Sequence, residues 1–308
     1  MERKILISTS SYGKVDSKPL ELLEQAGFEV TLNPYGSKLS ISQSIELLAG
    51  QTALIAGTEK LNAEIFDAHP QLKYICRLGT GMDSVDLDEA KNRNIPVENT
   101  PNAHVDGVAE LCLSGILDLH REVSFAHHNL KQGVWKKPMG SLLKGKTIGL
   151  IGLGKVAKRL VELLQPFNMK ILAVDKYWDS DFAKQYNVEQ VELDYLLQNS
   201  GIVSIHIPFS PENKNVISER ELNLMNSSAI LINTSRGGLI NEVDLLTHLK
   251  ANSMFKAYLD TYESEPYTGE LLSLDNILLT PHIGSYAKEV RLNMEMECAE
   301  KIIAYFNK

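Results

Sequence analysis

The sequence predicts an α/β protein made of two doubly wound parallel-sheet domains. Short apolar segments of strand length alternate with amphipathic segments of helical period along most of the chain. One stretch, from Gly145 to Asp175, has the order strand, glycine turn, helix, strand, acidic residue. Strands that alternate with helices build a parallel sheet covered by helices on both faces, and 308 residues are enough for two such sheets.

Composition and charge restrict the classes of function. Hydrophobic residues make up 44% of the chain, as in ordinary globular proteins. The net charge of −8 argues against a nucleic acid or an anionic membrane as partner, so we expect neither. An anionic small molecule would need a local cationic pocket, which makes individual arginines important.

The cysteines and the apolar segments indicate the compartment. Cys76, Cys112 and Cys298 are scattered without metal-binding spacing, so we expect reduced thiols, no metal site and a cytoplasmic protein. The apolar part of the N-terminus is too short for a signal peptide. No apolar run approaches the ~20 residues that span a bilayer.

The first hundred residues predict the first domain. Apolar segments at 4–8, 28–32, 52–56 and 73–77 have strand length, and helical patterns lie at 19–26, 40–48, 62–68 and 86–93. We expect a flavodoxin-like sheet here. Residues 97–102 then form a polar break, followed by one long helix over 103–130 and a loop over 133–144, which we interpret as the crossing between domains.

The second domain continues the alternation. Its predicted strands are 147–151, 170–174, 202–206, 229–233, 256–259 and 277–280. Helices are predicted from Lys155, over 192–198 and 218–225, and from Glu242 after an Asn241 cap. A last amphipathic helix covers 286–306.

The turn after the first strand of this domain predicts a dinucleotide site. Gly152 permits a sharp turn, and Gly154 lets the backbone approach a pyrophosphate without a Cβ in the way. Ala157 stands where a third glycine is usual and still allows close packing of helix on strand. Asp175 follows about 20 residues later, where it would accept hydrogen bonds from the ribose of NAD and repel the extra phosphate of NADP. The pattern therefore predicts a Rossmann domain that binds NAD.

Three strands of the second domain end near ionisable residues, Arg236, Glu265 and His282. Since the carboxyl ends of parallel strands meet at one edge, we expect these side chains to converge. A histidine is suited to proton transfer near neutral pH, and a neighbouring glutamate would fix the orientation of its ring. An arginine can bind a carboxylate through two parallel hydrogen bonds. In the first domain, Arg77 ends a strand before Leu78-Gly79-Thr80-Gly81, which read alone is a simple turn.

These segments resemble the D-isomer-specific 2-hydroxyacid dehydrogenases. The resemblance rests on 233–238 (NTSRGG), on Asp260 through Glu265-Pro266 and on 281–284 (PHIG), together with the nucleotide motif, and it covers nearly the whole chain. Within that family, 77–86 (RLGTGMDSVD) and 99–102 (NTPN) are most similar to D-3-phosphoglycerate dehydrogenases, which would place the chain in serine biosynthesis. The family's chain path implies a substrate domain of 1–100 and 286–308 and an NAD-binding domain of 101–285. It also implies a homodimer built through the long helix and the loop after it.

The resemblance also implies roles for residues. Arg236 would bind the substrate carboxylate, Glu265 would pair with the histidine, and His282 would be the proton donor. Other residues assigned to the substrate are Arg77 and the backbone amides around Leu78 and Gly79. Residues assigned to NAD are Thr80, Gly152, Gly154, Lys155, Val156, Asp175, His206, Ile207, Pro208, Thr234, Ser235, Arg236, Asp260, His282 and Gly284.

Two departures from the phosphoglycerate pattern leave the substrate open. Ala56-Gly57 stands where many of those enzymes carry an arginine that binds phosphate, and the sequence ends without the regulatory domain that many of them carry. D-3-phosphoglycerate with 3-phosphohydroxypyruvate is the first expectation, and glyoxylate, hydroxypyruvate or another 2-keto acid is the alternative. An NAD-sensing binding protein like the C-terminal-binding corepressors is an alternative of another class. Formate oxidation is disfavoured, because formate dehydrogenases carry glutamine where Glu265 stands.

Overall fold

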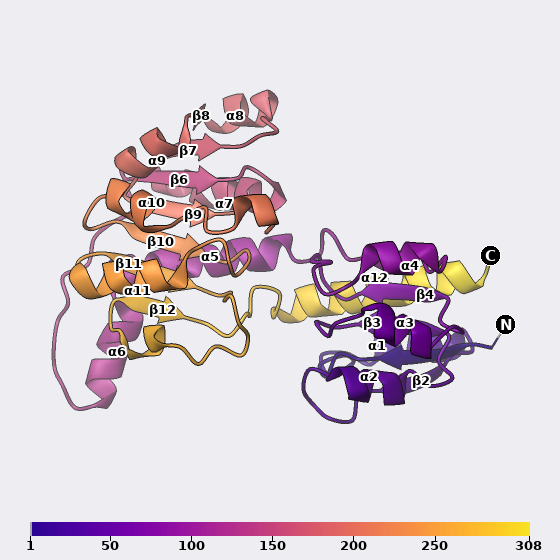
Figure 1. Cartoon of the computed structure of the whole chain (residues 1–308). Helices are drawn as coiled ribbons and strands as arrows, with labels where there is room; N and C mark the ends of the chain where they lie inside the picture. The colour runs from indigo at the N-terminus through magenta and orange to yellow at the C-terminus, as the bar shows by residue number, and fades with distance from the viewer. Residues whose placement is uncertain (1) are drawn as a thin grey trace. The chain divides into compact units, whose positions relative to one another are not determined.

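The computed structural model describes residues 2–308. The chain divides into two compact units. The first unit comprises Met1–His104 together with Ser285–Lys308, and the second comprises Val105–Gly284. Each unit holds one parallel sheet, five-stranded in the first and seven-stranded in the second (Figure 1).

The first unit has the strand order β2-β1-β3-β4-β5, which is the flavodoxin-like arrangement that the sequence predicts. Its strands are β1 (Lys4–Ile7), β2 (Glu29–Leu32), β3 (Ala53–Ala56), β4 (Tyr74–Arg77) and β5 (Val97–Asn99). Its helices are α1 (Lys18–Gln25), α2 (Ile41–Leu47), α3 (Ala63–Ala68), α4 (Leu87–Asn92) and, from the C-terminus, α12 (Lys288–Phe306).

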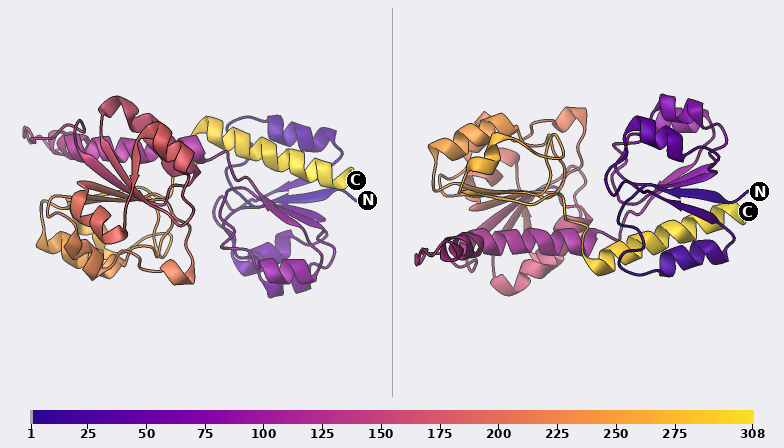
Figure 2. Two further views of the ribbon diagram at one scale, coloured as in Figure 1. Left: turned by 90° about the horizontal axis from the view of Figure 1, so that it is seen from above. Right: turned by 90° about the horizontal axis from the view of Figure 1, so that it is seen from below.

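Both faces of this sheet are covered (Figure 2). Helices α1 and α12 lie on one face, where Ile5, Ile7 and Cys76 point from the strands into a buried apolar cluster. Helices α2, α3 and α4 lie on the other face over Leu6 and Ile75. Neighbouring strand residues therefore face opposite sides, and the central strand β3 is apolar throughout because both of its sides are buried.

The second unit has the strand order β12-β11-β10-β9-β6-β7-β8. Its strands are β6 (Thr147–Ile151), β7 (Lys170–Val174), β8 (Val188–Gln190), β9 (Ile202–Ile205), β10 (Ile230–Asn233), β11 (Lys256–Leu259) and β12 (Ile277–Leu279). Its α-helices are α5 (Val105–Arg121), α6 (Val123–Lys131), α7 (Lys155–Leu164), α8 (Ser180–Tyr186), α9 (Leu193–Asn199), α10 (Glu219–Leu224) and α11 (Glu242–Ala251). Short 3₁₀ turns lie at Gln165–Phe167, Pro211–Asn213 and Glu270–Ser273.

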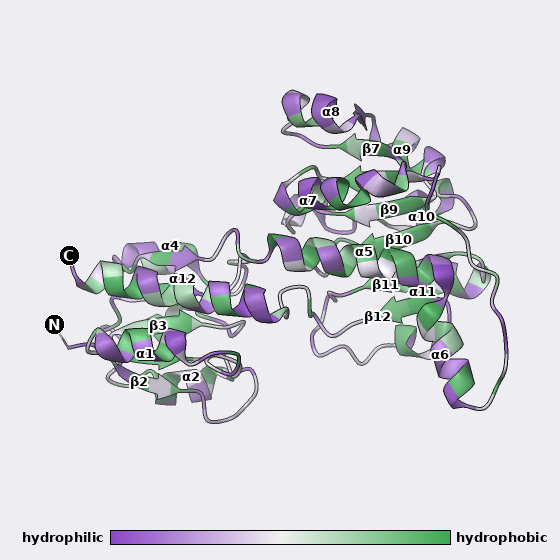
Figure 3. Cartoon of the chain, turned by 180° about the vertical axis from the view of Figure 1, so that it is seen from behind, coloured by the Kyte–Doolittle hydropathy of each residue, from purple (hydrophilic) through white to green (hydrophobic). Residues whose placement is uncertain are grey.

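This order has a topological switch point between β6 and β9. The chain runs outward from β6 through β7 and β8, and then returns to β9 on the other side of β6. In open sheets of this type, ligands bind outside the carboxyl ends of the strands at the switch point. Colouring by hydropathy shows the strands of this sheet as largely apolar between the more polar helices (Figure 3). The predicted fold class is confirmed.

The structure corrects three details of the predicted elements. The expected single helix over 103–130 is two helices, because Glu122 adopts a left-handed conformation (φ 54°) between α5 and α6. The expected polar break at 97–102 contains the edge strand β5, which pairs with β4. Helix α8 and strand β8 were not predicted at all, since both are short and β8 is polar at two of its three positions.

Candidate active site

The loop after β10 presents Arg236. Asn233, which is 2% exposed, holds this loop in place: its amide donates to the carbonyl of Arg236 at 2.7 Å, and its oxygen accepts from the backbone and hydroxyl of Ser235. Gly237 then passes so close to the Tyr262 carbonyl that a Cβ there would overlap it. Glycine is required at 237 because the loop with Arg236 packs directly on the loop that follows β11.

The loop after β11 carries Glu265, and the loop after β12 carries His282. Nδ1 of His282 lies 2.8 Å from Oε2 and 3.1 Å from Oε1 of Glu265. The Glu265 carboxylate also accepts from the backbone N–H of Tyr262 at 3.1 Å, which orients it. Since Glu265 occupies Nδ1, the other ring nitrogen of His282, Nε2, is the one that can exchange a proton with a ligand. The structure thus brings the predicted pair together.

A buried aspartate fixes the loop that holds the histidine. Asp260 is 0% exposed, and its carboxylate accepts from the backbone N–H groups of Ile283 and Gly284, both at 2.8 Å, and from the hydroxyl of Thr280 at 2.5 Å. Burial raises the pKa of Asp260, whereas these hydrogen bonds oppose that change. His282 itself has φ 55°, a left-handed conformation that is costly for a residue with a side chain. Three hydrogen bonds to one carboxylate hold the loop in that conformation.

The turn after β6 fits a dinucleotide. Gly152 has φ 97°, and a Cβ there would come within 2.8 Å of the His206 carbonyl at the end of β9. Gly154 is the N-cap of α7, and a Cβ on it would meet nothing within 4 Å, so there is open space in front of the helix amides. Ala157 is fully buried, as close packing of this helix on the sheet requires. An anion at this helix start would meet backbone donors and the positive end of the helix dipole.

Asp175 ends β7 beside that turn. Its Oδ2 accepts from the Leu153 N–H at 2.5 Å, and its Oδ1 accepts from the Tyr177 N–H at 2.6 Å. The carboxylate therefore lies next to the glycine turn, as the sequence predicts for the residue that meets the ribose.

The remaining residues assigned to the cofactor lie at the same edge of the second sheet, except for one. His206, Ile207 and Pro208 follow β9, and burial lowers the pKa of His206 to about 4, so its ring is neutral near pH 7. The ring lies 2.9 Å from the Ser204 hydroxyl. Lys155 and Val156 begin α7, whereas Thr234 and Ser235 follow β10. Thr80 belongs to the first unit, where its hydroxyl lies 2.7 Å from Nδ1 of His104.

The loop after β4 contains the backbone amides around Leu78 and Gly79 that were expected to donate to the substrate carboxylate. The N–H of Leu78 donates to the Ala56 carbonyl at 2.9 Å, and the N–H of Gly79 donates to the Thr100 hydroxyl at 3.0 Å. Neither amide is therefore an open donor for a carboxylate, which corrects the expectation for these two positions. Within residues 2–308, the next amides, of Thr80 and Gly81, make no such hydrogen bond and are the available donors.

The guanidinium of Arg77 folds over the same loop. One of its nitrogens donates to the Leu78 carbonyl, and a Cβ at Gly79 would fall 2.5 Å from that nitrogen. Arg77 thus stabilises the conformation of this loop through its contact with Leu78 and Gly79. The sequence did not reveal this contact, because it depends on the φ of 143° at Gly79.

Sequence reasoning also missed Glu59. This glutamate follows β3, is only 3% exposed, and accepts a 2.5 Å hydrogen bond from the Ser8 hydroxyl at the end of β1. The signal available in the sequence was an acidic residue three positions after the apolar end of a strand. That pattern alone does not distinguish a buried carboxylate from a solvated one.

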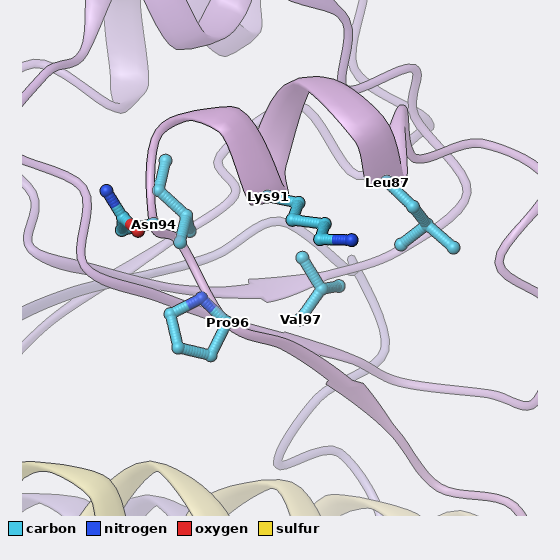
Figure 4. Close-up of a pocket in the computed structure, with 6 residues that line it drawn as sticks. Leu87, Lys91, Asn94, Pro96 and Val97 are labelled. Atoms are coloured by element: carbon cyan, nitrogen blue, oxygen red, sulfur yellow. The ribbon is translucent and has the colours of Figure 1, made fainter.

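A shallow hollow on the first unit is not part of this arrangement. It is lined by Leu87, Lys91, Asn94, Ile95, Pro96 and Val97 (Figure 4). Residues 94–97 lead into β5, so the hollow lies at the amino end of that strand, opposite the carboxyl ends where ligands of such sheets bind.

Among the helices of residues 2–308, none is long and apolar enough to cross a membrane.

Comparison with known proteins identifies the family. Residues 113–284 match the family model described as D-isomer specific 2-hydroxyacid dehydrogenase, NAD binding domain. The chain is 32% identical over 293 residues to a D-3-phosphoglycerate dehydrogenase of Archaeoglobus fulgidus, covering 94% of this chain and 55% of that protein. It therefore spans about half the length of that relative.

Two relatives of more similar length carry other names. A glyoxylate reductase of Thermococcus litoralis is 36% identical over 258 residues, with 80% of this chain and 78% of that protein covered. A hydroxypyruvate reductase of Thermotoga maritima is 36% identical over 255 residues, with 81% and 82% covered. These relatives are thus named partly for a phosphorylated hydroxy acid and partly for unphosphorylated keto acids.

A solved structure extends the likeness to the whole fold. The NAD⁺-bound 3-phosphoglycerate dehydrogenase of Entamoeba histolytica is 26% identical, with a TM-score of 0.83 over 100% of this chain and 96% of that one. The family match covers the glycine turn, Asp175, Arg236, Glu265 and His282. The chain belongs to the D-isomer specific 2-hydroxyacid dehydrogenase family, as an oxidoreductase with that family's NAD-binding domain.

Proposed function

We propose that the protein interconverts a small D-2-hydroxy acid and its 2-keto acid with NAD, with His282 as the group that moves the hydroxyl proton. The observation that carries this proposal is the hydrogen bond between Nδ1 of His282 and Glu265. It leaves Nε2 to face the substrate oxygen and stabilises the imidazolium that donates to it. When bound, the nicotinamide supplies or accepts the hydride at C2 of the acid.

The other residues position the acid. The fork of the Arg236 guanidinium suits a carboxylate and would polarise the neighbouring carbonyl as negative charge develops on its oxygen. The open amides of Thr80 and Gly81 are the donors that we assign to the carboxylate in the first unit, in place of those of Leu78 and Gly79. Asp260 acts indirectly, because it holds the loop of His282 through Ile283 and Gly284. Contact of Asp260 with the cofactor stays a prediction.

Two substrates remain candidates. The pair D-3-phosphoglycerate and 3-phosphohydroxypyruvate is favoured by the sequence pattern around Arg77 and by relatives that carry that name. Glyoxylate or hydroxypyruvate is favoured by the relatives of similar length and by Ala56-Gly57, which offers no cation to a phosphate.

An NADH-oxidation screen over glyoxylate, hydroxypyruvate, pyruvate and phosphohydroxypyruvate tests the proposal. We expect turnover of at least one acid by the wild-type protein and loss of at least ~100-fold in kcat when His282 is replaced by alanine. NADH binding without turnover of any of these acids would contradict the proposal and would fit an NAD-sensing binding protein.

We further propose that the protein is a cytoplasmic homodimer that pairs through its NAD-binding domain. Helix α6 and the loop after it expose large apolar side chains, among them Trp135 at 79% and Met139 at 94%. Exposed apolar groups in such number within one segment indicate a protein contact. Light scattering during size-exclusion chromatography should give twice the mass of 34.3 kDa, and Trp135→Glu should shift the protein toward the monomer.

A further inference from the structure

The peptide between Tyr262 and Glu263 lies where two neighbouring loops of the second unit meet. It belongs to the loop after β11, which also carries Glu265. A Cβ added to Gly237, in the loop after β10, would fall 1.9 Å from the Tyr262 carbonyl oxygen and 2.6 Å from the Glu263 nitrogen. The peptide therefore packs directly on Gly237, and the conformation of the loop that carries Glu265 depends on how this peptide is held.

Glu242 binds the N–H of this peptide. It is the first residue of α11 and is partly buried. Its Oε1 accepts a hydrogen bond from the Glu263 N–H at 2.7 Å. The preceding N–H, that of Tyr262, donates to Oε1 of Glu265 at 3.1 Å. Two consecutive backbone N–H groups of the loop therefore donate to carboxylates, and one of these carboxylates is the partner of His282.

The charges around Glu242 show that its hydrogen bond offsets a repulsion. Burial raises the pKa of Glu242, the hydrogen bond from the Glu263 N–H opposes this change, and the negative charges of Glu263 and Glu265 raise the pKa further. Glu263 pairs with Lys214 at 3.1 Å. Glu242 itself makes no ion pair with any cation of residues 2–308. Its hydrogen bond to the loop is thus the contact that holds this carboxylate near Glu265.

We infer that Glu242 is a positioning residue for the proposed reaction: its hydrogen bond to the loop after β11 keeps the Glu265 carboxylate on Nδ1 of His282. The inference rests on the proposed function. Because Glu265 is exposed, burial does not fix its side chain, and the backbone of its loop has to be held from outside. Since Glu242 acts through Glu265, its loss should matter only while the ring of His282 is present to be oriented.

The test measures kcat with the fastest of the screened keto acids, the Kd for NADH and the free energy of unfolding. Glu242→Ala removes the acceptor, whereas Glu242→Gln keeps an oxygen for the N–H and removes only the charge. The matched control is Asp244→Ala. Asp244 lies in the same first turn of α11, and its carboxylate accepts from the backbone N–H of Glu219, the first residue of α10, at 3.0 Å. Both alanine variants lose the same kind of hydrogen bond, but only Glu242 binds the loop of Glu265.

We expect Glu242→Ala to lower kcat by roughly 10-fold, with the Kd for NADH within about twofold of the wild-type value. Glu242→Gln should keep kcat within about threefold of the wild type, because its oxygen still accepts from the loop. In a His282→Ala background, Glu242→Ala should change kcat by less than about twofold. Asp244→Ala should lower the free energy of unfolding as Glu242→Ala does, but should leave kcat within about twofold of the wild type.

The outcomes separate the inference from the proposed function. A full further loss in the His282→Ala background, or a Glu242→Gln variant as slow as Glu242→Ala, overturns the role of Glu242 while the proposed function stands. An equal loss of kcat in Asp244→Ala also overturns it, because the effect is then one of stability. If the wild-type protein oxidises NADH with none of the acids, the proposed function fails, and the inference fails with it.

A second variant covers the case in which Glu242→Ala does not fold. Glu242→Met keeps most of the side-chain volume and offers only a weak acceptor, so the same loss of kcat is expected from it. If neither variant folds, Glu242 is a structural residue and the inference is overturned.

Discussion

Nδ1 of His282 lies 2.8 Å from Oε2 of Glu265, although the two residues belong to loops after different strands. The sheet creates this relationship because β11 and β12 are parallel neighbours whose carboxyl ends lie side by side. Asp260 and the left-handed φ of His282 complete the arrangement. Both residues belong to the second unit, so contacts within that unit alone hold the pair together without a ligand.

Replacing His282 with alanine should lower kcat for keto-acid reduction by at least ~100-fold, because the proton donor is lost. NADH binding should be nearly unchanged, since the glycine turn and Asp175 are not altered. Stopped-flow turnover and NADH fluorescence titration measure the two quantities. A variant that retains turnover within a few-fold of the wild type would exclude His282 as the proton donor.

Replacing Glu265 with glutamine should lower kcat by roughly 10- to 100-fold through loss of ring orientation and of the negative charge beside the imidazolium. The same change made in a His282→Ala background should have almost no further effect, because Glu265 acts through the histidine. Comparison of kcat for the two single variants and the double variant measures that coupling. Additive losses would show that Glu265 acts elsewhere.

The wild-type protein should prefer NADH over NADPH by at least ~10-fold in kcat/KM, since repulsion of ~1.4 kcal/mol between Asp175 and the extra phosphate already gives that factor. Asp175→Asn should reduce the preference by about the same factor. Asparagine keeps one acceptor oxygen for the Leu153 N–H but loses the second acceptor for the Tyr177 N–H, so kcat/KM for NADH in the variant shows whether the turn is kept. Equal use of the two cofactors by the wild type would contradict the role of Asp175.

The free energy of unfolding should fall as the pH is lowered from 6.5 toward 4, in part because of His206. Burial lowers the pKa of His206 from 6.5 to about 4, so between these values the unfolded chain binds a proton that the folded chain does not. The contribution of His206 is fully present above pH 6.5 and is lost as the pH falls, by up to about 3 kcal/mol. Denaturant titrations at pH 7 and 4.5 should show a smaller pH dependence for His206→Gln than for the wild type. An equal dependence in both proteins would mean that the His206 ring is protonated in the folded state.

The fold class was predicted correctly from the sequence because the alternation of strands and helices determines the sheet topology, whereas the roles of the site residues stay predictions. The glycine turn, Asp175 and the pair Glu265–His282 follow from strand ends and residue types, because parallel topology brings such ends together. The break at Glu122 and the edge strand at 97–99 were missed, since each depends on tertiary packing rather than on periodicity. The sequence also could not show which backbone amides already have a hydrogen-bond acceptor. The N–H of Gly79, for example, donates to the hydroxyl of Thr100, a residue 21 positions further along the chain.

Arg77 provides the last prediction. Because its guanidinium bonds to the Leu78 carbonyl and lies over Gly79, its removal should disturb the loop whose next amides we assign to the carboxylate. Arg77→Ala should therefore lower kcat/KM by roughly 10- to 150-fold for glyoxylate and phosphohydroxypyruvate alike, which corresponds to a charge-assisted contact of about 1.5–3 kcal/mol. Steady-state kinetics with both acids measures this. Arg77→Lys should recover only part of the loss, because an ammonium cannot cover the loop as a planar guanidinium does. A loss confined to phosphohydroxypyruvate would make Arg77 a phosphate ligand and would favour the phosphorylated substrate.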